Sequence, residues 1–369
     1  MNKAIIVGLP RMDTPIVRDF LPPFVTALHE FGASVWIEPD YGHQMGVAVS
    51  DYPATVHSRE EIFTGADIVL QLTAPSEHYI DMMHEGQTLI SMLHFPTHSA
   101  RNSLLRAKGV TAVSLDSMTD DQGARVVEDL RRTAHNGIRA GFAALRNVLG
   151  DQVWFSPKRP PVWVYLMGHG AVGHHAVDAI FDLGGQRTEL IERKGNPAVQ
   201  LTIATSAFSL NGGHGHKLAF QNIPRYGCLC QPGPEVVVDA TLRRNPTEHI
   251  LQAEHLCKLS HKAVIIDLDA SCYTDAEVKG IQGIPTGGSE QYLFLPDDPA
   301  YELVPAQYRL PRGLRPATVV SHYSWPSFGT QFDWVTQMSR YGTQILPYLA
   351  EMIGPHSETL TAVVRRATL

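Results

Sequence analysis

A glycine-rich turn between two apolar segments constrains the fold of this chain more than any other feature. The stretch at 162–185 reads VWVYLMGHGAVGHHAVDAIFDLGG. Its opening residues, VWVYLM, are mostly apolar or β-branched, as in a buried strand. After the turn, apolar side chains recur at helical spacing at Val172, Ala176, Ile180 and Leu183. The stretch therefore predicts a strand, a tight glycine turn and a helix.

The turn has the spacing GxGxxG, with glycines at Gly168, Gly170 and Gly173. In a dinucleotide-binding turn the first glycine permits the bend, the second lets the backbone approach a pyrophosphate, and the third lets the helix pack on the strand. Backbone N–H groups at the start of the helix, around Ala171 and Val172, would then hold the phosphates. The turn thus predicts a dinucleotide site. The alternative is a turn whose glycines serve only the bend.

A second strand-like run, Thr188–Ile191, follows the helix and ends at Glu192. An acid about 20 residues beyond the glycines accepts hydrogen bonds from the ribose hydroxyls in such sites. Glu192 would repel the 2′-phosphate of NADP, which favours NAD. Arg193 and Lys194 come directly after it and are able to bind that phosphate, so NADP stays open as the alternative.

The composition narrows the class of protein and its partners. At 369 residues, with 44% hydrophobic and 18% charged residues, the chain is long enough for two globular domains. A net charge of −7 argues against nucleic acid as a partner. No run approaches the ~18 apolar residues of a membrane span, and the N-terminal apolar run is too short for a signal peptide, so we expect a cytoplasmic protein. We expect no metal, because the cysteines lack zinc-site spacing and the pair His214 and His216 has no third ligand.

Strand and helix patterns alternate on both sides of the glycine turn. Before it, strands are predicted at 3–9, 34–38, 66–72, 88–93 and 110–115. After it, strands are predicted at 235–240, at 263–269 and near Val319. Helices are predicted over 126–148 and 332–352, and loops over 152–161 and most of 274–316. Such alternation implies parallel sheets, so we predict an α/β fold with two Rossmann-like domains.

The order of these signals resembles the alanine dehydrogenase and pyridine nucleotide transhydrogenase superfamily, which includes saccharopine dehydrogenases and carboxyethyl ornithine synthases. Besides the glycine turn, the likeness rests on ADIVL at 66–70 with Pro75, on EGQTLISMLH at 85–94, on GVTA at 109–112 and on VIID at 264–267. The resemblance implies a discontinuous catalytic domain, 1–132 plus 321–369, and a dinucleotide-binding domain at 133–320. It places the active site in a cleft between the two domains and implies a homo-oligomer.

The resemblance also implies roles for single residues. His94 matches the family's histidine at the end of a Leu-His strand, which acts as acid/base or substrate ligand. Arg18, with Pro23 five residues later, matches the N-terminal arginine that grips the substrate carboxylate. The chain departs from the family at two positions. The stretch that carries the family's lysine reads QLTAP at 71–75, and the position of the family's aspartate is Ser271, with Asp269 two residues earlier.

Each candidate has a structural alternative. Arg18 can hold a carboxylate through its planar guanidinium or lie solvated on the surface. His94 can titrate near neutral pH as an acid or base, or fill a core position. Asp269 and Ser271 can bond the ribose or the substrate, or cap the next turn. Ser324 lies in a segment that would line the nicotinamide pocket, beside His322 and Trp325.

These residues predict an NAD(P)-dependent oxidoreductase that acts on the C–N bond of an amino acid, with an amino acid or 2-oxo acid as its small-molecule substrate. The missing lysine makes a second reaction a competitor, the reductive joining of an amine to a 2-oxo acid, because an iminium substrate is already activated. A catalytically inactive nucleotide-binding protein is the alternative of another class.

Overall fold

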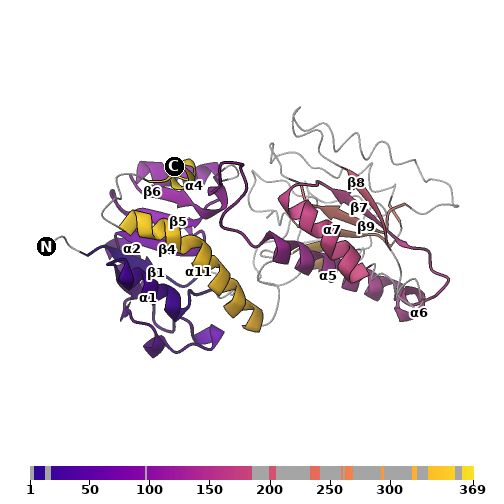
Figure 1. Cartoon of the computed structure of the whole chain (residues 1–369), viewed down its shortest axis with the longest axis horizontal. Helices are drawn as coiled ribbons and strands as arrows, with labels where there is room; N and C mark the ends of the chain where they lie inside the picture. The colour runs from indigo at the N-terminus through magenta and orange to yellow at the C-terminus, as the bar shows by residue number, and fades with distance from the viewer. Residues whose placement is uncertain are drawn as a thin grey trace. The chain divides into compact units, whose positions relative to one another are not determined.

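The computed structural model of the chain consists of two compact units, Met1–Asp129 with Gly329–Leu369, and Leu130–Phe328 (Figure 1). The structure describes residues 4–12, 18–95, 98–184, 199–204, 233–241, 259–260, 262–268, 292–294, 318–321, 331–353 and 360–369. The chain leaves unit 1 after its first 129 residues and returns to it with its last helices. No helix in these ranges is both long and apolar enough to cross a membrane.

Unit 1 is built on a parallel sheet of six strands in the order β3-β2-β1-β4-β5-β6. The strands are β1 (Ile6–Leu9), β2 (Ser34–Ile37), β3 (Thr55–Val56), β4 (Ile68–Thr73), β5 (Thr88–Met92) and β6 (Thr111–Ser114). The chain builds outward from β1 through β2 to β3, then starts again at β4 on the other side of β1. The strand order therefore reverses between β1 and β4, and ligands of open α/β sheets bind at the carboxyl ends of the strands beside such a reversal.

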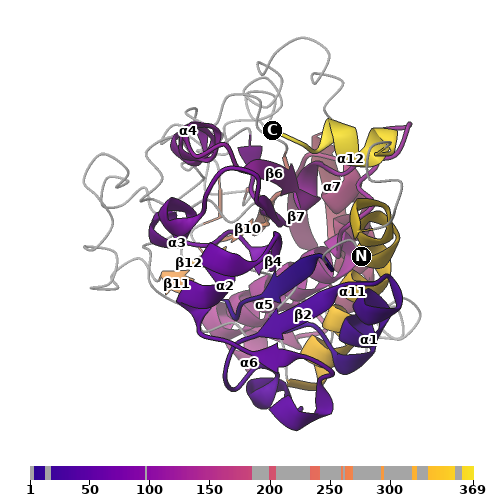
Figure 2. The ribbon, with the colours of Figure 1, turned by 90° about the vertical axis from the view of Figure 1, so that its left-hand side faces the viewer.

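Helices cover both faces of this sheet (Figure 2). They are α1 (Pro22–Glu30), α2 (Arg59–Gly65), α3 (Glu77–Met82), α4 (Ser99–Ala107), α11 (Gln331–Ile353) and α12 (Ala362–Arg366), with short 3₁₀ turns at His43–Met45, Val49–Asp51 and Leu115–Ser117. Local chemistry sets several starts. Two prolines occupy the first turn of α1, and Ser58 caps α2 through a reciprocal pair of hydrogen bonds with Glu61.

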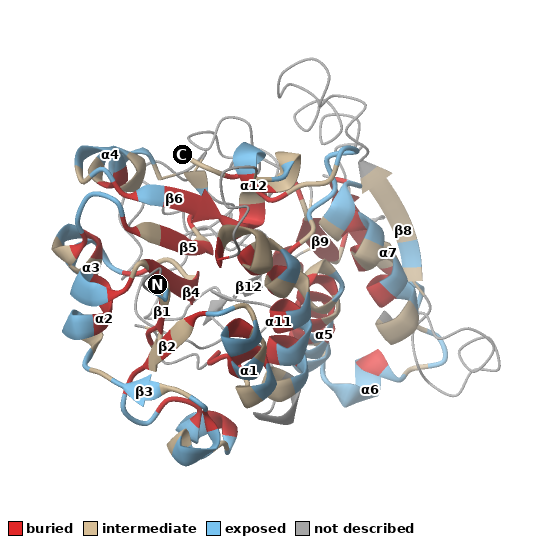
Figure 3. Cartoon of the chain, turned by 60° about the vertical axis from the view of Figure 1, so that its left-hand side comes forward, coloured by how far each residue is buried: buried red, intermediate tan, exposed pale blue. Residues whose placement is uncertain are grey.

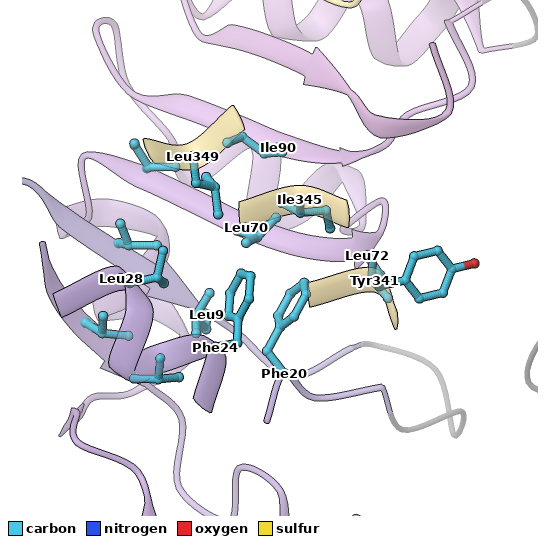
Figure 4. Close-up of a cluster of buried hydrophobic side chains, with 14 of the residues drawn as sticks. Leu9, Phe20, Phe24, Leu28, Leu70, Leu72, Ile90, Tyr341, Ile345 and Leu349 are labelled. Atoms are coloured by element: carbon cyan, nitrogen blue, oxygen red, sulfur yellow. The ribbon is translucent and has the colours of Figure 1, made fainter. Parts of the chain in front are cut away.

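The last long helix completes the core of unit 1. Tyr341, Ile345 and Leu349 recur every four residues on α11 and are buried in one cluster with α1 and the sheet (Figure 4). Gly342 permits the close approach of α11 to α1, because a Cβ there would lie 3.1 Å from the Phe24 ring. A second cluster, which includes Phe63, fills the opposite face under α2, α3 and α4. The buried colours of Figure 3 follow the strands and the inner faces of these helices.

Unit 2 holds a second sheet of six strands, in the order β11-β12-β10-β9-β7-β8. The strands are β7 (Val162–Met167), β8 (Val199–Ala204), β9 (Val236–Asp239), β10 (Val264–Asp267), β11 (Tyr292–Phe294) and β12 (Thr318–Ser321), and the helices are α5 (Leu130–Leu149), α6 (Asp151–Trp154) and α7 (Ala171–Gly184). All pairs are parallel except β11 with β12, which is antiparallel. The strand order reverses at β7, whose neighbours are β8 and β9.

The predicted α/β class with parallel sheets is confirmed, and details of the prediction are corrected. The segment 152–161, expected as a loop, opens inside helix α6. Strand β11 lies in the stretch 274–316 that was expected to be mostly loop. A further strand was expected after helix α7, at Thr188–Ile191. That run lies outside the described residues.

Candidate functional site

His94 lies at the carboxyl edge of the sheet in unit 1, two residues beyond the end of β5. Its backbone adopts a left-handed conformation with φ of 50°, which few non-glycine residues do. Hydrogen bonds from the neighbouring strand hold this conformation. The N–H of Leu93 donates to the Ser114 hydroxyl at 3.1 Å, and the N–H of His94 donates to Oδ1 of Asp116 at 3.2 Å. Such local strain, when neighbours hold it, is typical of functional positions.

Asp116 also holds the imidazole of His94. Its Oδ2 lies 3.3 Å from Nδ1 of His94, and its Oδ1 accepts a hydrogen bond from the Ser114 hydroxyl at 2.6 Å. Burial alone would raise the pKa of Asp116, but the hydrogen bonds and the charge of His94, with the Ser114 hydroxyl, hold that pKa well below its usual range. The carboxylate side chain is 6% exposed and the imidazole 50% exposed. A buried anion thus orients a histidine whose ring reaches solvent.

Arg18 is buried, 6% exposed, and not a solvated surface residue. Its Nη2 donates to the hydroxyl of Thr73 at 3.1 Å, and that hydroxyl lies 3.2 Å from the sulfur of Met12. Thr73 ends β4 and pairs in register with Met92 of β5, two residues before His94. Arg18 and His94 therefore stand at the ends of two neighbouring strands. The two residues that the sequence singled out in this unit thus both lie at the carboxyl edge of its sheet.

A buried polar cluster at the same sheet edge was not identified from the sequence. Asp19 is 2% exposed and accepts a hydrogen bond from the N–H of Gly42 at 2.8 Å. Burial raises its pKa to about 6, although the Gly42 hydrogen bond and the charge of Arg11 lower it. Glu38, at the end of β2, forms an ion pair with Arg59 at 2.6 Å. The sequence signal for this cluster was the charged loop after β1, which contains Arg11. The backbone N–H of Arg11 donates to Glu38 at 3.0 Å, and its charge acts on Asp19.

The glycine turn in unit 2 has the geometry that its spacing predicted. Gly168 follows β7 with φ of +86°, and a Cβ there would lie 2.5 Å from the carbonyl oxygen of Ala240, next to the end of β9. A Cβ on Gly173 would overlap the carbonyl oxygen of Gly168. Gly170 differs, because a Cβ built on it meets nothing within 4 Å. Gly168 and Gly173 are thus required by the fold, whereas Gly170 borders open space. The turn lies where the strand order of the sheet reverses, which is where dinucleotides bind in such folds.

The start of α7 fits a pyrophosphate. Ala171 is its first residue and is exposed, and Val172 packs partly against the core. The backbone N–H of His174 donates to the carbonyl oxygen of Gly170. The ring centroids of His174 and His169 lie 5.9 Å apart. An exposed glycine with room above it, followed directly by a helix of 14 residues, supplies backbone N–H groups and a positive dipole end. These residues fit a dinucleotide phosphate group.

The other predicted site residues lie outside the described residues. They are Glu192, Arg193, Asp269, Ser271, Ser324 and the alternative acid–base candidate His322. Their roles stay predictions, as does the choice between NAD and NADP. Within the described ranges, no group of three or more His, Cys, Asp or Glu side chains is placed to hold a metal ion.

The first unit is similar to a known family of domains. Residues 20–135 match the family described as "Alanine dehydrogenase/PNT, N-terminal domain". NAD(P) transhydrogenase subunit alpha of Haemophilus influenzae is 22% identical over 290 residues, 72% of this chain and 56% of that protein. Alanine dehydrogenase of Mycolicibacterium smegmatis is 23% identical over 176 residues, 45% of this chain and 47% of that protein. The matched segments thus span about half the length of these curated relatives.

Solved structures show the same fold. An L-alanine dehydrogenase superposes with a TM-score of 0.61 at 18% identity, covering 99% of this chain and 94% of that one. A transhydrogenase from Sinorhizobium meliloti superposes with a TM-score of 0.62 at 15% identity, covering 99% of this chain and 98% of that one. These structures confirm the fold that the resemblance implied, and the family match over residues 20–135 and the curated relatives confirm the resemblance itself.

Proposed function

We propose that this chain, whose residues 20–135 match the N-terminal domain of the alanine dehydrogenase/PNT family, is an NAD(P)-dependent oxidoreductase that acts on the C–N bond of an amino acid. Its substrates are a small amino acid and the corresponding 2-oxo acid. The observation that carries the proposal is the His94–Asp116 pair at the carboxyl edge of the unit 1 sheet. Oxidative deamination moves protons as well as a hydride, so it needs a positioned acid–base group.

The site residues of both units have distinct roles in this proposal. Arg18 binds the substrate carboxylate, since a guanidinium makes two parallel hydrogen bonds to a carboxylate. His94 accepts a proton from the water that adds to the imine carbon and returns one to the departing amine. Asp116 orients the imidazole and stabilises its positive form. The turn at Gly168, Gly170 and Gly173 holds the pyrophosphate of the dinucleotide, which supplies the hydride acceptor when bound.

A second candidate function follows from the relatives. NAD(P) transhydrogenase subunit alpha matches 72% of this chain, and the lysine that the family uses to polarise the substrate oxygen is absent from the stretch 71–75. Hydride transfer between two nicotinamides needs no acid–base group. The strained, anion-held His94 is therefore unnecessary for transhydrogenation, and this favours the reaction on an amino acid.

Reductive joining of an amine to a 2-oxo acid is the alternative within the same chemistry. A preformed iminium is already electrophilic, so it needs no lysine at the carbonyl oxygen. In this reaction His94 would donate the proton that drives water from the carbinolamine. An inactive nucleotide-binding protein is disfavoured, because it would have no use for the buried Arg18 and the His94–Asp116 pair.

One assay separates these functions. The purified protein is given NADH or NADPH with each of a panel of 2-oxo acids, first with ammonium and then with a primary amine or amino acid, and absorbance at the nicotinamide band is followed. We expect oxidation with ammonium. Oxidation of the nicotinamide only with the primary amine or amino acid supports the joining reaction. Reduction of a thio-NADP analogue by NADH without any 2-oxo acid supports transhydrogenation. The absence of a reaction in every arm contradicts an enzymatic role.

A further inference from the structure

Gln71 carries a buried amide near the end of a strand in unit 1. It lies near the carboxyl end of β4 and is 2% exposed. Neither its side-chain nitrogen nor its side-chain oxygen has a hydrogen-bond partner among the residues that the structure describes. A primary amide offers two donors and one acceptor, and leaving them unpaired inside a protein costs folding free energy. Because the unpaired amide lowers the stability of the folded chain, we infer that Gln71 serves a purpose other than folding.

Gln71 lies two residues before Thr73, the last residue of β4. Leu70 and Leu72 lie in the cluster with α1 and α11, as Figure 4 shows, and Val69 lies in the cluster on the opposite face. Successive side chains of a strand point to opposite faces, so Gln71, between Leu70 and Leu72, points to the face that carries Val69. The pairing of β4 with β5 is irregular between Leu70 and Thr73, at the carboxyl end of the strand. The Thr73 hydroxyl is the partner of the Arg18 guanidinium at 3.1 Å.

A second buried glutamine of the same unit, Gln87, has an amide that is fully hydrogen-bonded. Gln87, just before β5, is 1% exposed. Its nitrogen donates to the carbonyls of Phe63 at 3.0 Å and Ala66 at 2.7 Å, and its oxygen accepts from the N–H of His84 at 2.8 Å. Unit 1 thus satisfies one buried glutamine fully, whereas the amide of Gln71, near the carboxyl end of β4, has no hydrogen bond within the described part of the chain.

We propose that Gln71 is a specificity-determining residue that hydrogen-bonds a neutral polar group on C2 of the substrate, the oxygen of a 2-oxo acid or the nitrogen of its imine, while Arg18 holds the carboxylate. The inference rests on the proposed function. The amide donates to a carbonyl oxygen and accepts from an N–H, so it recognises both forms. It carries no charge and transfers no proton, which leaves the acid–base step to His94.

This role predicts selection against ligands that lack a polar group at C2. A site built to hydrogen-bond a substrate group rejects analogues without it, because its own buried polar atoms then stay unpaired. Pyruvate carries the oxygen, and propionate is a carboxylate of the same length without it. We expect wild-type protein to bind pyruvate at least about tenfold more tightly than propionate, the usual effect of one hydrogen bond.

The test compares Gln71→Met with Gln87→Met, since methionine keeps the length of glutamine without its polar atoms. Thermal unfolding of the ligand-free protein is measured first. Gln71→Met should keep or raise the Tm, and Gln87→Met should lower it by stranding three backbone groups. A clear fall in Tm for Gln71→Met would show that the amide is satisfied within the fold, and would overturn the proposal.

Calorimetric titration with pyruvate and with propionate, in the presence of NADH, is the second measurement. Gln71→Met should lose about tenfold in pyruvate affinity and none for propionate, and in turnover it should raise KM more than it lowers kcat. Unchanged pyruvate affinity in Gln71→Met, with wild-type turnover intact, overturns the role of Gln71 alone. Selective binding by wild type without turnover of any 2-oxo acid instead overturns the proposed reaction and leaves Gln71 as a binding residue. Failure of wild type to bind either acid overturns both.

Discussion

Nδ1 of His94 lies 3.3 Å from Oδ2 of Asp116, and the backbone N–H of the same histidine donates to Oδ1 of the same carboxylate at 3.2 Å. One buried anion thus fixes both the backbone and the ring of His94. The residues come from the ends of adjacent strands, β5 and β6, whose parallel register pairs Ser91 with Ser114. Backbone strain at His94 and its ring orientation therefore share one cause, and the two can be tested separately.

Replacement of His94 should reduce turnover and leave cofactor binding unchanged. General acid–base groups contribute about 10²–10⁴-fold, so His94→Ala should lower kcat by about that range. His94→Asn should recover substrate binding without turnover, since an amide bonds but does not titrate. Steady-state kinetics and NADH titration measure both. His78→Ala, on the exposed surface of α3, is the matched control and should behave as wild type. A His94→Ala protein with wild-type kcat would remove the acid–base assignment.

Asp116→Asn should act through His94. The change keeps the shape of the side chain and removes the charge beside the imidazole, and hydrogen bonds to charged groups contribute about 1.5–3 kcal/mol. We expect kcat to fall about 10- to 150-fold with a small change in KM. A double variant with His94→Ala should be no slower than His94→Ala alone. Additive losses would show that Asp116 acts on stability and not on the histidine.

Arg18→Lys should weaken the hold on the substrate carboxylate. The variant keeps the positive charge but loses the planar pair of donors, so KM should rise by the equivalent of about 1.5–3 kcal/mol. Arg146→Lys is the control, because Arg146 is an exposed arginine paired with Asp151 in the other unit. Steady-state kinetics with a 2-oxo acid measure the effect. An unchanged KM would leave the buried Arg18 with a structural role beside Thr73 and the carboxylate without an assigned partner.

The sequence predicted elements better than it predicted contacts. Periodicity and strand-end residues located β4, β5, β7, β9 and β10 within a few residues, and the long helix α11. The four-residue helix α6 was missed because the prolines after it dominate the local pattern. The partner of His94 was not predicted, although the predicted strand 110–115 ends directly before Asp116. Which strand end faces which depends on the parallel pairing of β5 with β6, and a single sequence does not encode that register locally.

The same limit applies to the buried polar residues. The predicted strand 66–72 contains Gln71, yet the sequence gives no sign that its amide lacks a partner among the described residues while that of Gln87 has three. The burial of Arg18 depends on Thr73, 55 residues later in the chain. The glycine turn was predictable because the residues that determine it, those of the strand, the bend and the helix, are consecutive in the sequence.

Asp19 should make the stability of the protein depend on pH. Burial raises its pKa from 3.8 to about 6, so the folded state binds more protons than the unfolded state between pH 4 and 6. Stability should therefore fall as the pH rises through this window and level off above it, by about 3 kcal/mol at about 1.4 kcal/mol per pKa unit. Asp19→Asn should gain stability relative to wild type at pH 7 and not at pH 4. Urea unfolding at both values measures this, with Asp81→Asn, an exposed partner of Lys108, as control. An equal difference at the two pH values would contradict the assignment.

The glycines of the turn should separate into two classes when each is changed to alanine. Gly168→Ala places a Cβ 2.5 Å from the carbonyl of Ala240 at a positive φ, so it should cost at least about 1–3 kcal/mol of folding free energy. Gly170→Ala meets nothing within 4 Å, so stability should stay within about 0.5 kcal/mol of wild type. Its added methyl would instead occupy the space of a bound pyrophosphate, and NADH affinity should fall at least about tenfold. Thermal unfolding and calorimetric NADH titration of both variants provide the comparison. A Gly170→Ala protein that is stable and binds NADH as wild type does would show that the pyrophosphate does not lie against this turn.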